Sequence, residues 1–192
     1  TAALETDKGS GREKIIGLLA PYNSPSLDLG GFVEVYEPGC FRESLASGDD
    51  VLILAFHDLS KVLGSKINGT AKLWEEPDGL HYLVDLPDTH AADDVATLVE
   101  RGDIRGSSAA FFITQHRWEQ RGGIRTRIIE RAVLVEGGPC PYPAYQESTS
   151  AVEPADPPVD EPVPQPEPQP EEVAAEDYDL EHFRARISLL NV

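Results

Sequence analysis

Short alternations of apolar and polar residues run through positions 13–145 and predict a mainly β domain. Pro, Gly and Asn separate the segments, as is typical of turns between strands. Val51–Phe56 is uninterrupted apolar sequence, which predicts a strand buried on both faces. The other predicted strands are Ile15–Ala20, Phe32–Tyr36, Ala71–Trp74, Leu80–Leu86, Ser107–Thr114 and Arg125–Val135.

Two further patterns predict a hairpin and a helix. Asp78-Gly79 separates two predicted strands and supplies the positive φ that a tight turn needs. In the second of these strands His81 and Tyr82 should point to opposite faces. An apolar stripe at helical spacing predicts a helix over Thr89–Arg101, and a shorter helix is expected over Phe41–Ser47.

About seven short strands with few helices predict a mainly β (α+β) fold, a closed or nearly closed β-barrel. We assign this folded domain to residues 1–150. Alternating Pro with Glu or Gln makes 151–179 a disordered, acidic, Pro-rich linker. Apolar residues recur at helical spacing in 180–192, which predicts a short amphipathic helix. That helix could dock on its own domain or bind a partner or a protease groove.

The charge is unevenly divided. The net charge is −18, and residues 1–150, with 23 acids and 14 bases, hold −9 of it. Such acidity argues against nonspecific binding to nucleic acid, which needs a surplus of Lys and Arg. A basic cluster around Trp118, comprising Arg117, Arg121, Arg125 and Arg127, is explained more simply as a solvated hairpin. No apolar run is long enough to span a membrane.

Few residues suggest chemistry. The two cysteines, Cys40 and Cys140, suit a reducing cytosol better than a disulfide scaffold. The five histidines are too scattered for a zinc site, and no motif calls for a cofactor. His57 ends the most hydrophobic strand, where a group that titrates near neutrality can act as a general base. Small residues around Ser108 leave room for a substrate backbone to approach a hydroxyl, which needs an adjacent base to become a nucleophile.

A series of motifs along residues 15–149 resembles the tailed-phage prohead serine proteases, which mature capsids. The motifs occur in the family's order. They are GLLAPY at Gly17–Tyr22, EVYEPGCF at Glu34–Phe41, AFHD at Ala55–Asp58, LPDT at Leu86–Thr89, RGSSAAF at Arg105–Phe111 and LVEGGP at Leu134–Pro139, followed by Pro143-Ala144-Tyr145. Gly137-Gly138 departs from the pattern, because the family has Val-Ser there.

The resemblance implies a catalytic set of His57 as base, Ser108 as nucleophile and Glu136 as the acid that orients the histidine. Ser107 competes with Ser108, but the family's serine stands three residues before the Phe, which selects Ser108. Asp58 is adjacent to His57 and should point to the other face. The family is distantly similar to herpesvirus assemblins, which have a second histidine in the triad, so His81 is the alternative to Glu136.

The resemblance also implies a function and its setting. We expect an assemblin-like fold and a serine endopeptidase that cleaves capsid scaffolding segments, and itself, inside the procapsid in the host cytoplasm. Its protein substrates would be the major capsid protein precursor and the scaffold, and it could form a homodimer. We expect it to bind neither nucleic acid nor a membrane. The alternative is a noncatalytic capsid-assembly or scaffold module on the same barrel.

Overall fold

The fold is mainly β with two helices among the residues described. The computed structural model describes residues 13–153, and the predicted helix 180–192 and most of the predicted linker lie outside them. The elements in chain order are β1 (Lys14–Pro21), β2 (Val33–Tyr36), α1 (Arg42–Ala46), β3 (Leu52–Leu54), β4 (Val62–Ser65), β5 (Ala71–Glu76), β6 (Gly79–Asp85), α2 (His90–Glu100), β7 (Gly106–Arg121), β8 (Ile124–Cys140) and β9 (Ala151–Glu153).

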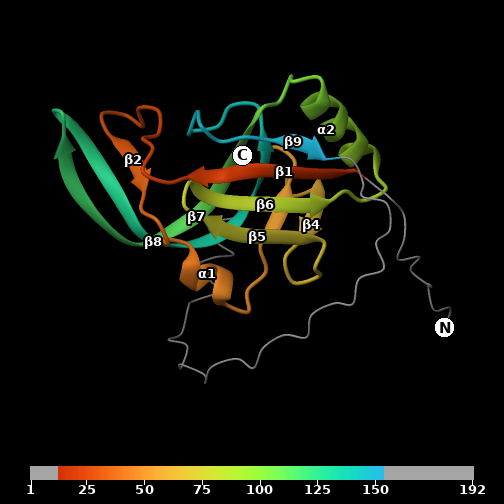
Figure 1. The fold of residues 1–192 in the computed structure, drawn as a ribbon, viewed down its shortest axis with the longest axis horizontal. Helices are drawn as coiled ribbons and strands as arrows, with labels where there is room; N and C mark the ends of the chain where they lie inside the picture. The colour runs from red at the N-terminus through yellow and green to blue at the C-terminus, as the bar shows by residue number, and fades with distance from the viewer. Residues whose placement is uncertain (1–12, 154–192) are drawn as a thin grey trace. The chain divides into compact units, whose positions relative to one another are not determined.

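The strands form two sheets (Figure 1). The first has the order β5-β6-β1-β9, with antiparallel neighbours throughout. In the second, β7 pairs with β8 along its length, and the opposite edge of β8 takes parallel β2 near its start and parallel β3 near its end. β4 extends that sheet beyond β3. The distal part of the β7–β8 hairpin projects past the first sheet (Figure 1).

The expected barrel closure is wrong, whereas the mainly β composition is confirmed. Neither sheet closes among the described residues, because β5 and β9 end the first sheet and β4 and β7 lie at edges of the second. Closure would require each edge strand to pair with another. The alternation of apolar residues predicts which faces are buried, but it does not specify which strands pair, so it could not reveal two sheets.

Local patterns explain the other elements. The helix predicted after residue 88 is α2, and the Thr89 hydroxyl caps it by accepting from the N–H of Ala92 at 3.3 Å. β5 and β6 form the predicted hairpin, in which Tyr82 is fully buried while His81 stacks on Trp74. β4 and β9 were not predicted. β9 covers the first three residues of the segment predicted as a linker and pairs with β1.

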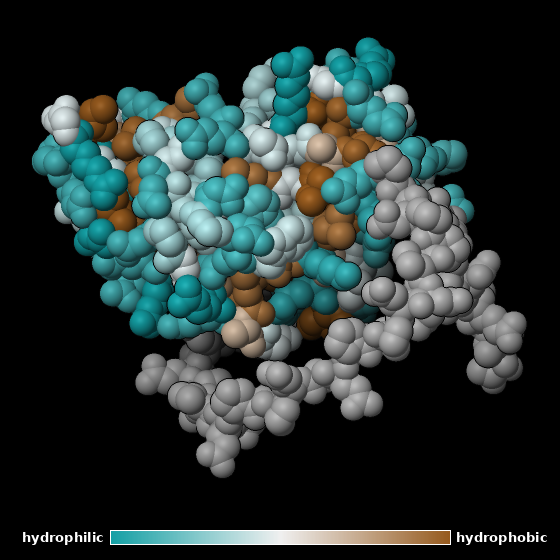
Figure 2. Space-filling view, in the orientation of Figure 1, coloured by the Kyte–Doolittle hydropathy of each residue, from teal (hydrophilic) through white to brown (hydrophobic). Residues whose placement is uncertain are grey.

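The core lies on the inner faces of the two sheets and against α2. Its largest fully buried side chains include Ile15 on β1, Tyr82 on β6 and Ile129 on β8. Tyr36 and Phe41 add aromatic contacts with ring centroids 5.4 Å apart. In Figure 2, one face of the molecule carries hydrophobic residues in separate small groups among hydrophilic ones. The core therefore fixes β1, β6 and β8, and β8 is the strand on which the candidate site is built.

Candidate active site

β8 brings together three segments that are distant in sequence. Ser108 on β7 is paired with Gly138 on β8, and the parallel strand β3 pairs Leu52 with Glu136. Directly paired residues project their side chains to the same face, and residues two apart on one strand also share a face. Ser108 and Glu136 therefore lie on one face of the sheet, at the end of β8 where β3 also finishes.

His57 lies in the turn that follows β3. Phe56 and His57 both have a left-handed backbone, with φ of 59° and 60°. Such φ values are uncommon outside glycine and concentrate at functional sites, where the surrounding structure holds them. Here the Phe56 N–H donates to the carbonyl of Pro139 on β8 at 3.0 Å, and the Asp58 N–H donates to Ala55 at 3.0 Å. The turn is thus tied to the strand that carries Glu136.

The His57 ring is joined to Glu136. Nδ1 of His57 and Oε1 of Glu136 are 2.6 Å apart. The Glu136 side chain is 10 % exposed and that of His57 is 36 % exposed, so a buried carboxylate fixes a ring whose other edge can reach solvent. A carboxylate on Nδ1 sets the tautomer and leaves Nε2 available to a reacting group. Glu136 Oε2 is buried and has no hydrogen-bond partner among the described residues.

The two neighbouring serines have different surroundings. Ser107 is 1 % exposed, and its hydroxyl lies 2.7 Å from the carbonyl oxygen of Thr149 and 3.0 Å from the hydroxyl of Tyr82. Ser108 points to the opposite face of β7 and is half-buried at the wall of a cleft that His57 also lines. Within residues 13–153 no hydrogen bond joins the Ser108 hydroxyl to the His57 ring. Strand alternation thus separates a structural serine from an accessible one.

The other two residues considered as partners of His57 are engaged elsewhere. The Asp58 carboxylate accepts from the backbone N–H of Ser60 at 2.9 Å and lies 3.3 Å from the Lys61 ammonium. His81 Nε2 lies 2.9 Å from an Asp78 carboxylate oxygen in the β5–β6 hairpin. Of the three residues considered as orienting partners, Glu136 is therefore the one within hydrogen-bonding distance of the His57 ring.

The departure from the family pattern at Gly137-Gly138 has a steric explanation. A Cβ on Gly138, whose φ is 150°, would lie 2.2 Å from the carbonyl oxygen of Leu54 on β3. A Cβ on Gly137 would lie 2.7 Å from the side chain of Leu19 on β1. The two glycines let β3 and β1 approach β8 closely, and β3 leads directly to His57.

Cys140 is the residue of the site that the sequence reasoning missed. It ends β8, on the same face as Glu136, and its side chain interacts with the His57 ring. Cys140 and then Glu136 raise the pKa of His57 to about 10, against partial burial, which lowers it. Burial opposes ionisation of the Cys140 thiol, but His57 and the Tyr142 N–H outweigh it and lower its pKa. The sequence could have pointed to Cys140 by its spacing, because residues 136, 138 and 140 of one strand share a face.

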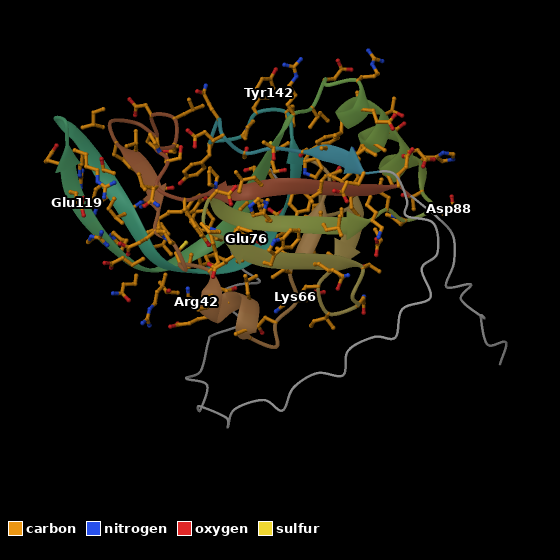
Figure 3. The ribbon with its side chains drawn as sticks, in the orientation of Figure 1. Arg42, Lys66, Glu76, Asp88, Glu119 and Tyr142 are labelled. Carbon is orange, nitrogen blue, oxygen red and sulfur yellow. The ribbon has the colours of Figure 1, made fainter. Side chains whose placement is uncertain are left out.

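The cleft beside these residues has a volume of about 890 Å³. Leu27 and Leu29 line it, and both are exposed apolar side chains. Tyr142 is 91 % exposed in the loop that follows β8, where Figure 3 labels it at the edge of the molecule. Charged residues also line the cleft, namely Asp28, Asp103 and Arg105. An extended peptide with apolar side chains would find complementary surface there.

Two further observations bear on the expected cofactors and partners. In residues 13–153 no three His, Cys, Asp or Glu side chains are arranged to hold a metal ion. On the projecting hairpin, where Figure 3 labels Glu119, Arg117 forms ion pairs with Glu37, Glu119 and Glu130. Arg125 stacks over Trp118, with its guanidinium carbon 3.9 Å from the ring centroid. Much of the charge of this basic cluster is therefore balanced by carboxylates of the hairpin and of the segment around β2.

A histidine fixed by a carboxylate, in a cleft with a strand-borne serine, is typical of serine peptidases. The chain belongs to the caudovirus prohead serine protease family, whose sequence model matches residues 1–157. The description of that family, a serine protease of the phage prohead, agrees with the arrangement of the site.

The chain is also similar to solved structures, among them a viral protease. The KSHV protease, determined in complex with a hexapeptide phosphonate inhibitor, is 11 % identical with a TM-score of 0.48. The match covers 74 % of this chain, which spans 65 % of the length of that protease. No curated protein matches the chain by sequence. Neither helix in the described part of the chain has the length and apolarity to cross a membrane.

Proposed function

We propose that this peptidase cleaves scaffolding segments of the capsid protein precursor inside the assembling procapsid, using Ser108 as nucleophile, His57 as base and Glu136 as the orienting acid. The observation that carries the proposal is the 2.6 Å contact between His57 Nδ1 and Glu136 Oε1, in a cleft that Ser108 also lines. The family description, which refers to the prohead, supports the setting.

The reaction begins with a neutral His57. Nε2 accepts the Ser108 proton as Oγ attacks the scissile carbonyl, and Glu136 stabilises the resulting imidazolium. The imidazolium then gives the proton to the leaving amine, the C–N bond breaks, and an ester of Ser108 remains. A water molecule, deprotonated by His57, attacks that ester and releases the acid product with regeneration of the serine hydroxyl.

The absence of a Ser108–His57 hydrogen bond within the described residues fits an enzyme without substrate. Catalytic hydrogen bonds are often long in free enzymes and tighten in the substrate complex. His57 belongs to a turn and not to a strand, so a small rotation of its ring would move Nε2 without disturbing the sheet.

The cleft supports a preference for apolar side chains in the substrate. Leu27 and Leu29 are 47 % and 39 % exposed in the free protein, and a bound peptide would cover them. Burying apolar surface contributes roughly 25 cal/mol per Å². An extended scaffold segment with an apolar residue near the scissile bond is therefore the substrate class that we infer. Segments of the protease itself that meet this description would also be cut.

The direct test is cleavage of the capsid protein precursor by the wild type and by Ser108→Ala. We expect processing of the precursor, and of the protease itself, to fall to background in Ser108→Ala. Ser107→Ala is the matched control, because it removes the neighbouring hydroxyl from the opposite face of β7 and should retain cleavage. Undiminished processing by Ser108→Ala, or loss of processing in Ser107→Ala alone, would reject the proposed nucleophile.

A further inference from the structure

The proposed nucleophile lies close to the end of its strand. β7 begins at Gly106, and on one edge of the strand Gly106 is paired with Cys140 and Ser108 with Gly138, both on β8. β8 is the one strand of the described residues that pairs with β7. Strand ends open more easily than strand centres, so other contacts are needed to hold this end. The chain supplies them after β8, in residues 145–150, which we call the return segment.

The return segment is bonded to the start of β7. The N–H of Ser107 donates to the Ser148 hydroxyl at 3.2 Å. The N–H of Ser150 donates to the carbonyl of Arg105 at 2.8 Å. The Ser150 hydroxyl donates to the carbonyl of Gly106 at 3.0 Å. The main chain directly before the proposed nucleophile is therefore held by this segment as well as by β8.

The return segment is itself anchored at both ends. Tyr145 is buried, and its ring stacks on Tyr36 with centroids 4.4 Å apart. The Ser148 hydroxyl donates to the carbonyl of Tyr145 at 2.8 Å. At its other end the segment leads into β9, which pairs with β1 (Figure 1). The N–H of Thr149 also donates to the carbonyl of Leu18 on β1 at 3.1 Å. A segment fixed in the core and on the first sheet can hold β7 in place.

The three hydroxyls of the return segment are divided between the two sheets. Those of Ser148 and Ser150 bond to β7. That of Thr149 accepts from the N–H of Leu18 on β1 at 3.1 Å. A Cβ on Gly17 would lie 2.3 Å from the carbonyl oxygen of Thr149, so the missing side chain lets the segment approach β1 closely. Neighbouring hydroxyls therefore support two different strands, and one of these strands carries the proposed nucleophile.

We propose that Ser148 and Ser150 are positioning residues, which hold the start of β7 so that the Ser108 hydroxyl keeps its direction into the cleft. The inference rests on the function proposed above, in which Ser108 is the nucleophile. The bonds run to the main chain of β7, so they remain in Ser107→Ala, which is expected to retain cleavage. A misplacement of about 1 Å at a reacting group can cost about 10²-fold in rate, so a small movement of β7 is enough to lower activity.

The kinetic effect of Ser150 should differ from that of a residue that binds substrate. Ser150 is not among the described residues that line the cleft, so its hydroxyl has no direct contact with a bound peptide. A displaced nucleophile lowers the rate of the chemical step and leaves the binding surface intact. Loss of the Ser150 hydroxyl should therefore lower kcat with little change in KM. A hydroxyl that only stabilised the fold would change the free energy of unfolding without this effect on kcat.

The first test measures kcat and KM of full-length Ser150→Ala with a fluorogenic peptide that the wild type cleaves. We expect kcat to fall about tenfold and KM to stay within about twofold of the wild type. Thr149→Val is the matched control, because it removes the neighbouring hydroxyl, which supports β1, and keeps the shape of the side chain. It should lose stability in denaturant unfolding but retain kcat. Wild-type kcat in Ser150→Ala, or the same loss of kcat in Thr149→Val, would overturn the positioning role.

Amide hydrogen exchange tests the contacts without a substrate. In Ser148→Ala the N–H of Ser107 loses its acceptor, so it should exchange at least about tenfold faster, while the N–H of Leu18 keeps its rate. In Thr149→Val the N–H of Leu18 should exchange faster and that of Ser107 should not. Unchanged exchange at Ser107 in Ser148→Ala would overturn the proposal, because the Ser148 hydroxyl would then not hold β7.

The two measurements separate this inference from the proposed function. A wild type that cleaves no substrate, or cleavage that continues in Ser108→Ala, would count against the proposed function, and exchange at Ser107 would then decide whether the return segment fixes β7. Loss of cleavage in Ser108→Ala together with wild-type kcat in both Ser148→Ala and Ser150→Ala would reject the positioning role and leave the nucleophile in place.

Discussion

Replacing Cys140 by Ala should shift the pH dependence of cleavage to lower pH. His57 can accept the Ser108 proton only when its ring is neutral. Its pKa is raised from an ordinary 6.5 to about 10, and Cys140 is the first cause, followed by Glu136. We therefore expect a largely protonated His57 at neutral pH in the wild type, with cleavage activity that rises toward alkaline pH.

The size of the shift follows from the charge that is removed. Loss of the thiolate leaves Glu136 as the remaining group that favours the imidazolium, so the pKa of His57 should fall but stay above its ordinary value. We expect the acidic limb of kcat/KM to move down by at least about one pH unit, because Cys140 is the larger of the two contributions. Each unit by which the pKa of His57 falls raises the neutral fraction of its ring at pH 7 about tenfold.

The assay is kcat/KM for a fluorogenic peptide between about pH 5 and about pH 11, since kcat/KM reports the ionisation of the free enzyme. Cys140→Ser is a second version of the same change, with a hydroxyl that does not ionise in this range. Cys40→Ala is the matched control, because it removes a thiol that lines no part of the cleft. The same acidic limb in wild type and Cys140→Ala would refute the reasoning.

Three further predictions concern the supports of the site. Glu136→Gln should lower kcat at least about 10²-fold with little change in KM, because it removes the carboxylate that orients and stabilises the His57 ring. Ser107→Ala should lower the free energy of unfolding by about 1–3 kcal/mol, measured with denaturant, because it breaks a buried hydrogen-bond network. Gly138→Ala should destabilise the fold by more than about 2 kcal/mol because its Cβ would clash with β3, whereas Gly48→Ala meets open space and should change stability by less than about 0.5 kcal/mol.

Each of these has an outcome that would count against it. Wild-type kcat in Glu136→Gln would mean that the 2.6 Å contact has no part in catalysis. If Ser107→Ala and the wild type have the same free energy of unfolding, the Ser107 hydroxyl does not stabilise the fold. Equal stability of the Gly138 and Gly48 variants would show that β8 and β3 can shift apart at Gly138 at little cost in free energy.

Local patterns in the sequence predicted the elements whose stability is local. Helix α2 has its capping Thr89 and its apolar stripe within a dozen residues, and the β5–β6 hairpin has its turn sequence between its strands. β4 and β9 are only four and three residues long, and their pairing with distant strands is what makes them strands. The division into two sheets depends on the same long-range pairing.

In the candidate site, too, some features could be inferred from local sequence, whereas others depend on long-range strand pairing. Alternation along β7 separates Ser107 from Ser108, and this could be inferred from neighbouring residues. The contact between His57 and Glu136 joins positions 79 apart, and it arises because β3 lies parallel to β8. Only the resemblance to the family pointed to that pair. The spacing of Cys140 and Glu136 places them on one face of β8, but their closeness to His57 depends on the pairing of β3 with β8.

The most direct test of the central assignment is labelling with a serine-directed peptide phosphonate, followed by identification of the modified residue by mass spectrometry. The phosphonate should attach to Ser108 in the wild type, and labelling should disappear in Ser108→Ala and fall sharply in His57→Ala. A label on Ser107, or precursor cleavage that continues while Ser108 stays unlabelled, would contradict the assignment of Ser108 as the nucleophile.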